Sequence, residues 1–261
     1  MHVAEREKRI FELIRPSGFV AFQELERQID ASPATLRRDL DRLETEGRIT
    51  RVRGGARLNP IAAPSADTPR PLGGPTFPEN VRRRPVQKAV IGRAAAALCR
   101  PGESVIIDGG STTLQMCVHL EPLGLHVLTN SLHIVSALIS QPDTRISLPA
   151  GALFREQNII LSPFEDDGIA RYRASKMFIG AEAIGEHGLM QNDVLLVQAE
   201  RRLLQRASEV IVLVDSSKFD GPAGHVVCDL ADIDILITDA GVKPETRAML
   251  EAAGVKVMIA T

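Results

Sequence analysis

Two segments combine polar side chains in an order that suits the binding of a small anion. Residues 105–113 read VIIDGGSTT, in which an apolar run is followed by Asp108, two glycines and three hydroxyl side chains. Residues 213–219 read LVDSSKF, and here Lys218 follows another apolar run. Backbone N–H groups and hydroxyls after a strand can hold a phosphate, and a Lys supplies a point charge for it. A carboxylate accepts hydrogen bonds from sugar hydroxyls. We therefore expect a site for a small, anionic, hydroxylated ligand.

Two more turns extend this candidate site. Residues 128–132 read LTNSL and place Asn130 and Ser131 after an apolar run. Residues 147–153 read SLPAGAL and place Gly151 where backbone can approach closely. Each turn alone is also typical of ordinary helix capping, but ligands bind at the carboxyl ends of strands in open α/β sheets. The candidate ligand-binding residues are Asp108, Gly109, Ser111, Thr112, Thr113, Asn130, Ser131, Gly151 and Lys218.

Arginines near the amino terminus indicate a different chemistry. The whole chain has a net charge of −2, but residues 32–57 hold seven arginines and four acidic side chains, a local excess of +3. The spacing of Leu36, Leu40 and Leu43 predicts a helix capped by Ser32 with its arginines facing outward. Such a helix, with short side chains in its first turn, can enter the major groove of DNA. A merely solvated basic face is the alternative. The candidate DNA-binding residues are Ser32, Ala34, Thr35, Arg37, Arg38, Arg51 and Arg53.

Three short helices and a hairpin would position this arginine cluster. Apolar spacing predicts two helices that end near Pro16 and Asp30, before the helix that begins at Ser32. From Gly47 the segment GRITRVRGGA alternates apolar and basic residues and then reaches two glycines, as a small hairpin does. We therefore expect a winged helix-turn-helix domain over residues 1–57.

The rest of the chain predicts a linker and a larger domain. Prolines at positions 60, 64, 69, 71, 75, 78 and 85 are too dense for a continuous helix, so residues 58–85 are expected to join two domains. That linker is either partly extended or disordered. Beyond it, helical stretches alternate with apolar runs, which predicts an α/β domain with a mostly parallel sheet over residues 86–261. The runs are 105–107, 125–128, 145–148, 210–214, 233–237 and 255–259.

These motifs resemble one family. Residues 32–40, SPATLRRDL, resemble the recognition helix of the DeoR family of bacterial transcriptional regulators, and GRITRVRGGA resembles that family's wing. The DGGSTT loop, the TN turn and DSSKF resemble its sensor domain, so the resemblance covers nearly the whole chain. It implies that Thr35, Arg37 and Arg38 face DNA and that Asp39 fixes the helix by pairing with an Arg. It also implies a sensor similar in fold to ribose-phosphate isomerases.

The resemblance further implies partners. These are double-stranded operator DNA, a phosphorylated sugar or sugar-acid effector, and a second copy of the chain in a homodimer or homotetramer. The expected function is repression of a carbohydrate catabolic operon. Three departures affect the effector: DGGSTT has an extra glycine, PAGAL lacks the usual glycine pair, and Glu200 with Arg201 and Arg202 stands where many members have a Lys. The last departure resembles regulators of sugar-acid or ascorbate use.

Other classes of protein fit less well. Cys99, Cys117 and Cys228 are widely spaced and predict three reduced core thiols, with no disulfide, metal site or cofactor. The amino terminus does not read as a secretory signal, and no apolar run reaches membrane-spanning length, so we expect a cytoplasmic protein without membrane association.

Two alternative functions stay open. A sugar-phosphate isomerase or deaminase could use Asp108, Asp215, Lys218 and His225 as acid–base groups. We expect no enzyme, because catalysis would not require the amino-terminal helices and hairpin. A transcriptional activator, or an architectural DNA binder that ignores small molecules, is the second alternative, since repression and activation leave no distinct residue pattern.

Overall fold

The computed structural model describes residues 3–14, 19–45, 49–52, 54–58, 77–155, 157–162, 167–221 and 224–261. The chain divides into two compact units, Met1–Arg70 and Pro71–Thr261, and each is described by itself. Within the described ranges, no helix is long and apolar enough to cross a membrane.

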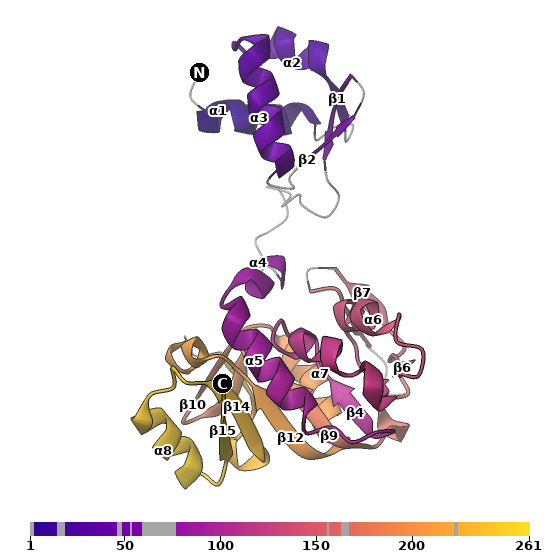
Figure 1. Cartoon of the computed structure of the whole chain (residues 1–261), viewed down its shortest axis with the longest axis vertical. Helices are drawn as coiled ribbons and strands as arrows, with labels where there is room; N and C mark the ends of the chain where they lie inside the picture. The colour runs from indigo at the N-terminus through magenta and orange to yellow at the C-terminus, as the bar shows by residue number, and fades with distance from the viewer. Residues whose placement is uncertain are drawn as a thin grey trace. The chain divides into compact units, whose positions relative to one another are not determined.

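The first unit packs three helices against a small antiparallel sheet (Figure 1). Its elements are α1 (Val3–Ile14), β1 (Phe19–Ala21), α2 (Phe22–Gln28), α3 (Pro33–Thr45), β2 (Ile49–Val52) and β3 (Gly55–Leu58). The strand order is β1-β3-β2, and β2 pairs with β3 as the predicted hairpin. Leu36, Leu40 and Leu43 are buried against Ile10 and Leu25. The predicted helices and hairpin are confirmed, whereas β1 was not predicted, because three residues are too few to show alternation.

The second unit is an α/β fold built on a seven-stranded sheet in which every pair of neighbours is parallel. In order across the sheet, the strands are β15 (Lys256–Ala260), β14 (Ile235–Asp239), β12 (Ala207–Leu213), β9 (Ala174–Ile179), β4 (Ser104–Ile107), β5 (His126–Leu128) and β6 (Arg145–Ser147). The predicted apolar runs correspond to six of these strands. The central strand β9 was missed because Lys176 interrupts its apolar pattern, and the structure buries this Lys by bonding it to Glu103.

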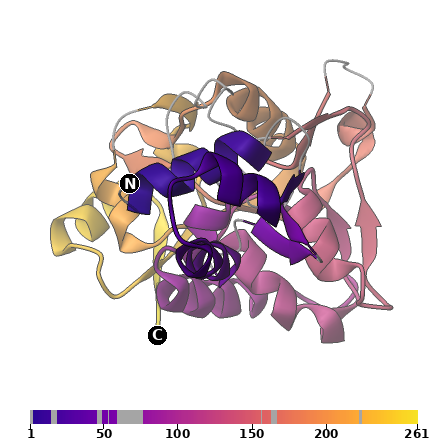
Figure 2. The same cartoon turned by 90° about the horizontal axis from the view of Figure 1, so that it is seen from above.

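Helices cover both faces of this sheet. One face carries α5 (Pro85–Ala96), the 3₁₀ helix η1 (Thr113–His119) and α6 (Leu132–Leu138). The other carries α7 (Val194–Leu204), α8 (Pro244–Ala252) and a small sheet of β10 (Ala183–Gly185), β11 (Gly188–Gln191) and β13 (His225–Cys228). Figure 2 shows α5 and α7 on opposite sides of the strands. The fold is therefore a three-layer α/β arrangement, as expected from the sequence.

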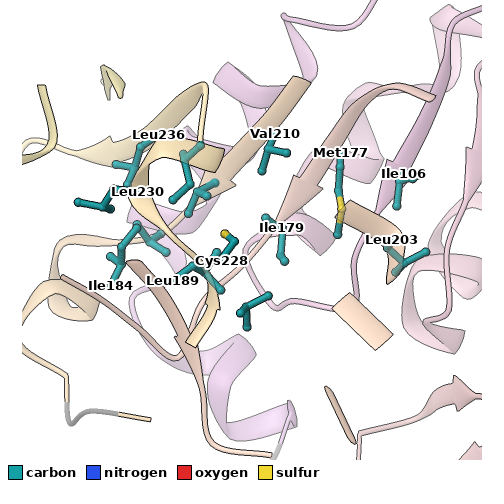
Figure 3. Packing of buried hydrophobic residues seen from close by; sticks show 14 of the residues in the cluster. Ile106, Met177, Ile179, Ile184, Leu189, Leu203, Val210, Cys228, Leu230 and Leu236 are labelled. Carbon is teal, nitrogen blue, oxygen red and sulfur yellow. The ribbon is translucent and has the colours of Figure 1, made fainter. Parts of the chain in front are cut away.

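Side chains of β9 alternate between two cores, which is the two-residue period of a strand buried on both faces. Phe178 belongs to the core under α5, whereas Met177 and Ile179 belong to the core under α7. Figure 3 shows Met177 and Ile179 in the second of these cores. The three cysteines are buried, as predicted for core residues, and burial raises the pKa of each thiol to about 12.

Helix α4 (Phe77–Arg82) lies inside the range predicted as linker. The predicted linker, residues 58–85, includes α4 and the start of α5, which the structure groups with the second unit. Pro78 is tolerated since it occupies the first turn of α4, where its missing N–H is not needed, and Pro85 begins α5 in the same way. Residues 59–76 lie outside the described part of the chain.

Parallel strands bring their carboxyl ends to one edge of the sheet. Asp108 follows β4, Asn130 follows β5, Glu182 follows β9 and Asp215 follows β12. We call the loops that contain these four residues the sheet-edge site. A two-stranded hairpin of β7 (Ala152–Phe154) and β8 (Ile159–Leu161) adjoins it, because Ser131 forms a bridge with Ile159.

Candidate functional site

The start of helix α3 has the expected cap. The Ser32 hydroxyl accepts a hydrogen bond from the Thr35 backbone N–H at 3.2 Å and lies 2.9 Å from the Thr35 hydroxyl. Ser32 and Ala34 are exposed, while the opposite face of the helix carries the buried leucines. The helix therefore presents short side chains and a satisfied first turn to solvent.

Two arginines extend from the exposed face of α3. Arg37 lies over the ring of Phe22 with its guanidinium carbon 5.2 Å from the ring centroid, a cation–π contact that restricts its position. Arg38 is exposed, and within the described part of the chain it forms no ion pair. A guanidinium in this state is free to bind phosphate or guanine.

Asp39 joins α3 to α1 beneath this face. It is 3% exposed, and its carboxylate accepts from Arg6 Nε at 2.7 Å and from Arg42 Nη2 at 3.1 Å. Arg42 also bonds Glu7 of α1 at 2.6 Å. The prediction that Asp39 fixes the helix by pairing with an Arg is confirmed. Arg42 consequently belongs to this network, although its spacing alone places it on the outward face.

The hairpin arginines differ from those of the helix. Arg51 bonds the carboxylate of Asp41, and its backbone N–H donates to Glu44 Oε1 at 2.8 Å, so both groups tie the hairpin to α3. Arg53, the other hairpin residue predicted to contact DNA, lies outside the described residues.

In the sheet-edge site, the loop after β4 is shaped by the hydroxyl of Thr113. This hydroxyl donates to the Asp108 carbonyl oxygen at 2.7 Å and accepts from the Gly110 N–H at 2.9 Å. Thr113 is fully buried. Its predicted place at the start of a helix is correct, but that helix is a seven-residue 3₁₀ helix, and the Thr113 hydroxyl is occupied inside the loop.

Ser111 of the same loop contacts a lysine that sequence reasoning did not select. Lys88 Nζ donates to Ser111 Oγ at 3.0 Å and to the carbonyl oxygen of Asn80. Lys88 is 3% exposed, and burial lowers its pKa, while the nearby carboxylate of Asp215 opposes that change. A signal was present, because Lys88 shares the buried face of α5 with Ile91 and three further small residues. A lysine on an otherwise apolar helix face needs a polar partner.

The DSSK segment, residues 215–218, lies close to Lys88, because the charges of Asp215 and Lys218 both affect the pKa of Lys88. Asp215 caps the 3₁₀ helix η4 (Ser216–Asp220) by accepting from the Ser217 N–H at 3.0 Å. Lys218 Nζ lies 3.2 Å from Glu182 Oε2. Arg84, just before α5, donates to Ser216 Oγ at 3.1 Å, and its Nε lies 3.6 Å from Asp215 Oδ1. Arg84 and Glu182 were not predicted, since both stand in segments without a recognisable motif.

The two candidate residues of the TN turn differ in their hydrogen bonding: Ser131 caps a helix, whereas the side-chain oxygen of Asn130 has no partner among the described residues. The Ser131 hydroxyl accepts from the Ile134 N–H and caps α6, so it is used by the helix. Asn130 is 2% exposed, and its Oδ1 has no hydrogen-bond partner among the described residues. It lines a small cavity of about 80 Å³ together with Asp167 and Arg202, which pair at 2.8 Å. The cavity therefore offers an acceptor for a donor that the described chain does not supply.

Two glycines of the candidate set serve close packing. A Cβ on Gly109 would lie 3.1 Å from both Ser131 Cβ and Ile159, so the loop after β4 packs tightly on the TN turn. A Cβ on Gly151 would lie 2.3 Å from the Leu161 carbonyl oxygen. The close backbone approach predicted for Gly151 exists, and its partner is strand β8.

Two buried carboxyl groups interact at this site, Asp108 of the loop after β4 and Glu200 of α7. Burial raises the pKa of Asp108 to about 6, opposed by a hydrogen bond from the Gly109 backbone. Burial and the charge of Asp108 raise the pKa of Glu200 well above its ordinary value, and Glu200 accepts from Gln191 Nε2 at 2.8 Å. Burial therefore favours the neutral form of both carboxyl groups relative to carboxyl groups in water.

The site thus has two chemically different parts. Lys88 contacts the Ser111 hydroxyl, and Lys218 and Asp215, the partner of Arg84, are close enough to affect the pKa of Lys88, so cationic groups that suit an anion gather here. Asp108 and Asn130 offer buried oxygen acceptors, which suit hydroxyl groups. Of the acid–base set considered for an enzyme, Asp215 caps η4, and His225 is an exposed residue at the start of β13.

Comparisons with known proteins match both units. Residues 6–61 match the DeoR-like helix-turn-helix domain, and residues 83–240 match the DeoR C terminal sensor domain. The chain is 31% identical over 258 residues to the HTH-type transcriptional regulator UlaR of Shigella dysenteriae serotype 1, and 99% of each chain is covered. It has the same identity and coverage with the UlaR regulator of Escherichia coli strain K12 / DH10B.

Two solved structures are similar over about half of the chain. Ribose 5-phosphate isomerase A of Methanocaldococcus jannaschii has 18% identity and a TM-score of 0.37, with 51% of this chain and 53% of that chain covered. The eIF2B delta subunit of Chaetomium thermophilum has 18% identity and a TM-score of 0.40, with 53% and 50% covered.

Proposed function

The chain belongs to the DeoR family of DNA-binding transcriptional regulators, and we propose that it represses a carbohydrate catabolic operon until a phosphorylated sugar or sugar acid releases it. The observation that carries the proposal is the contact between Lys88 and Ser111. A buried ammonium held against a glycine-rich loop at the carboxyl edge of a parallel sheet is suited to an anionic ligand.

The DNA-binding half of the proposal rests on α3. Ser32, Ala34 and Thr35 would enter the major groove, and Arg37 and Arg38 would bind base edges or phosphates. Arg51 and Arg53 would contact phosphates from the hairpin. For Arg51 this requires a phosphate to replace the carboxylate of Asp41, to which it is bonded in the free protein.

The effector-binding half assigns different roles within the sheet-edge site. The anionic group would be held by Ser111 and Thr112 with Lys88 and Lys218, and hydroxyl groups by Asp108 and Asn130. The remaining candidates would keep the loops in shape, because their contacts lie within the protein; these are Gly109, Thr113, Ser131 and Gly151.

We further propose that the active form is a homodimer or homotetramer on a two-fold symmetric operator, because paired helices in successive major grooves require paired readers. Sedimentation at micromolar concentration would then show dimers or larger species. A protein that stays monomeric both free and on its operator contradicts this part of the proposal.

Fluorescence anisotropy on labelled DNA from upstream of the protein's own gene tests both halves. Arg38→Ala should lose specific binding, whereas Arg145→Ala, which removes an exposed arginine of the second unit, should not. A panel of pentose and hexose phosphates and sugar acids should contain a compound that lowers operator affinity. Lys218→Ala should bind operator normally and resist release, whereas Lys256→Ala, an exposed control, should respond like the parent.

Linkage provides a second check. Operator DNA must weaken binding of the releasing compound by the same factor by which that compound weakens operator binding. An effector affinity that operator DNA leaves unchanged would contradict the mechanism. Enhanced operator binding with the compound, together with increased transcription in vitro, would identify an activator. Turnover of a sugar phosphate that Lys218→Ala abolishes would identify an enzyme.

A further inference from the structure

Helix α4 occupies a special place in the chain. The boundary between the two units lies between Arg70 and Pro71, and α4 is the first described element after it. Any covalent path from the sheet-edge site to the DNA-binding unit therefore passes through residues 77–84, which we call the α4 segment. The regulatory role that we assign to its contacts with the rest of the second unit rests on the proposed function.

One end of the α4 segment is attached through an aromatic stack. Phe77 is 5% exposed, and its ring lies 3.9 Å from the ring of His133 at an interplanar angle of 4°. His133 belongs to α6, the helix capped by Ser131 of the TN turn, and its Nε2 lies 3.2 Å from Asn158 Nδ2. The stack thus places the first residue of α4 on the helix that begins at the sheet-edge site.

The middle of the segment is attached through Lys88. The same ammonium group donates to the Asn80 carbonyl oxygen of α4 and to the Ser111 hydroxyl of the loop. An anion bound at Ser111 would attract this ammonium, and a charge-assisted bond to an anion is stronger than a bond to a neutral carbonyl. Two of the three N–H donors of this ammonium are used in these bonds, and a shift of Nζ toward an anion at Ser111 would lengthen its bond to the Asn80 carbonyl oxygen.

The other end of the segment is held in an unfavourable backbone conformation. Arg84 has φ +48° and ψ +51°, the left-handed region that residues other than glycine rarely adopt. It also precedes Pro85, and a residue before proline prefers an extended conformation. The bonds from Arg84 to Ser216 and Asp215 accompany this conformation. An anion that draws the guanidinium away would let the backbone relax toward the extended form.

We propose that the α4 segment is a clasp that the anionic effector opens. Without effector, Lys88 and Arg84 hold α4 on the second unit, and Phe77 stacks on His133. With effector, both cations turn to the anion, the Asn80 carbonyl loses Lys88 and keeps the Arg83 N–H as a donor, Arg84 relaxes and Phe77 leaves His133. The connection between the units then gains length and freedom, which lowers the chance that two DNA-binding units match a fixed operator spacing.

The composition of the chain makes the clasp directly observable. There is no Trp, so Phe77→Trp places a single tryptophan at the stack in the full-length protein. In the closed clasp this tryptophan should emit at short wavelength and resist quenching by acrylamide. Opening should shift its emission to longer wavelength and raise the quenching constant several-fold.

A substitution opens the clasp without any ligand. Lys88→Met in the Phe77→Trp background removes both hydrogen bonds while keeping a similar length, and it should expose the tryptophan. Lys218→Met in the same background is the matched control, because it removes a nearby charge that contacts Glu182 and not α4. Far-UV circular dichroism establishes that both variants are folded. A folded Lys88→Met protein whose tryptophan stays as protected as in the Lys218→Met protein overturns the proposal.

Ligand titration forms the second arm of the test. Ribose 5-phosphate and inorganic phosphate are the anionic probes and ribose the uncharged control, with binding measured independently by calorimetry. Exposure of the tryptophan that follows phosphate occupancy supports the clasp. Occupancy without exposure overturns the clasp and leaves the proposed effector site intact. Exposure in Lys88→Met, with no sugar phosphate or sugar acid of the wider panel bound, supports the Lys88 clasp and contradicts the proposed function.

Discussion

Replacement of Asp108 by Asn tests whether the buried charge at the sheet-edge site lowers the free energy of unfolding. Burial raises the pKa of Asp108 from an ordinary value of 3.8 to about 6, because its charged form has lost water and has one backbone N–H as compensation. The difference corresponds to roughly 3 kcal/mol in the free energy of unfolding at neutral pH. A raised acid pKa means that the folded state binds more protons between these two values. Stability must therefore fall as pH rises from about 4 to about 6.

The Asp108→Asn protein lacks this charge and should be more stable than the parent by up to about 3 kcal/mol at pH 7.5, with little difference at pH 4. Urea unfolding can be followed through Tyr172, the single tyrosine of a chain without tryptophan, which lies in the second unit. Glu200 also has a raised pKa, so the variant should keep a weaker pH dependence of the same sign.

Asp143→Asn is the matched control, because Asp143 is an exposed carboxylate of the same unit and its removal should change stability little at either pH. Equal unfolding free energies for Asp108→Asn and the parent at pH 7.5 would refute the reasoning. So would a gain of the same size at pH 4, where the carboxyl group is protonated.

Three further predictions concern the packing around the two sites. Asp39→Asn should destabilise the first unit by about 3 kcal/mol in thermal unfolding, because Arg6 and Arg42 lose their buried carboxylate partner, and it should weaken operator binding. An unchanged melting temperature of the Asp39→Asn protein would contradict this. Burial lowers the pKa of His133, so its contribution to stability should be complete above its ordinary value of 6.5 and decline as pH falls below it; His133→Gln should remove that decline in acid titrations. Gly188→Ala should destabilise the second unit by about 2 kcal/mol or more, because Gly188 has φ +100° and a Cβ there would lie 2.0 Å from the Cys228 carbonyl oxygen. A Gly188→Ala protein that unfolds in urea like the parent would disprove this close approach.

Sequence patterns predicted much of the first unit. The positions of Leu36, Leu40 and Leu43 determine which face of α3 is buried, so the outward direction of Arg38 followed from helix geometry. The same geometry placed Arg42 outward, yet the structure pairs it with Asp39 and Glu7. The reason is that α1 approaches that side of α3, and a packing partner from another helix has no trace in the period of α3 itself.

In the second unit, the parallel α/β architecture and the loops at the carboxyl edge could be predicted from local patterns, because apolar runs and the polar residues after them are close in sequence. Which side chains meet at that edge became visible with the folded structure. Lys176 of β9 and Lys88 of α5 each place a charged group on an apolar face. Their partners, Glu103 and Ser111, come from distant segments. The contacts of α4 and Arg84 likewise depend on how the chain returns to the sheet edge. Long-range pairing of this kind is set by packing in three dimensions, which no local spacing encodes.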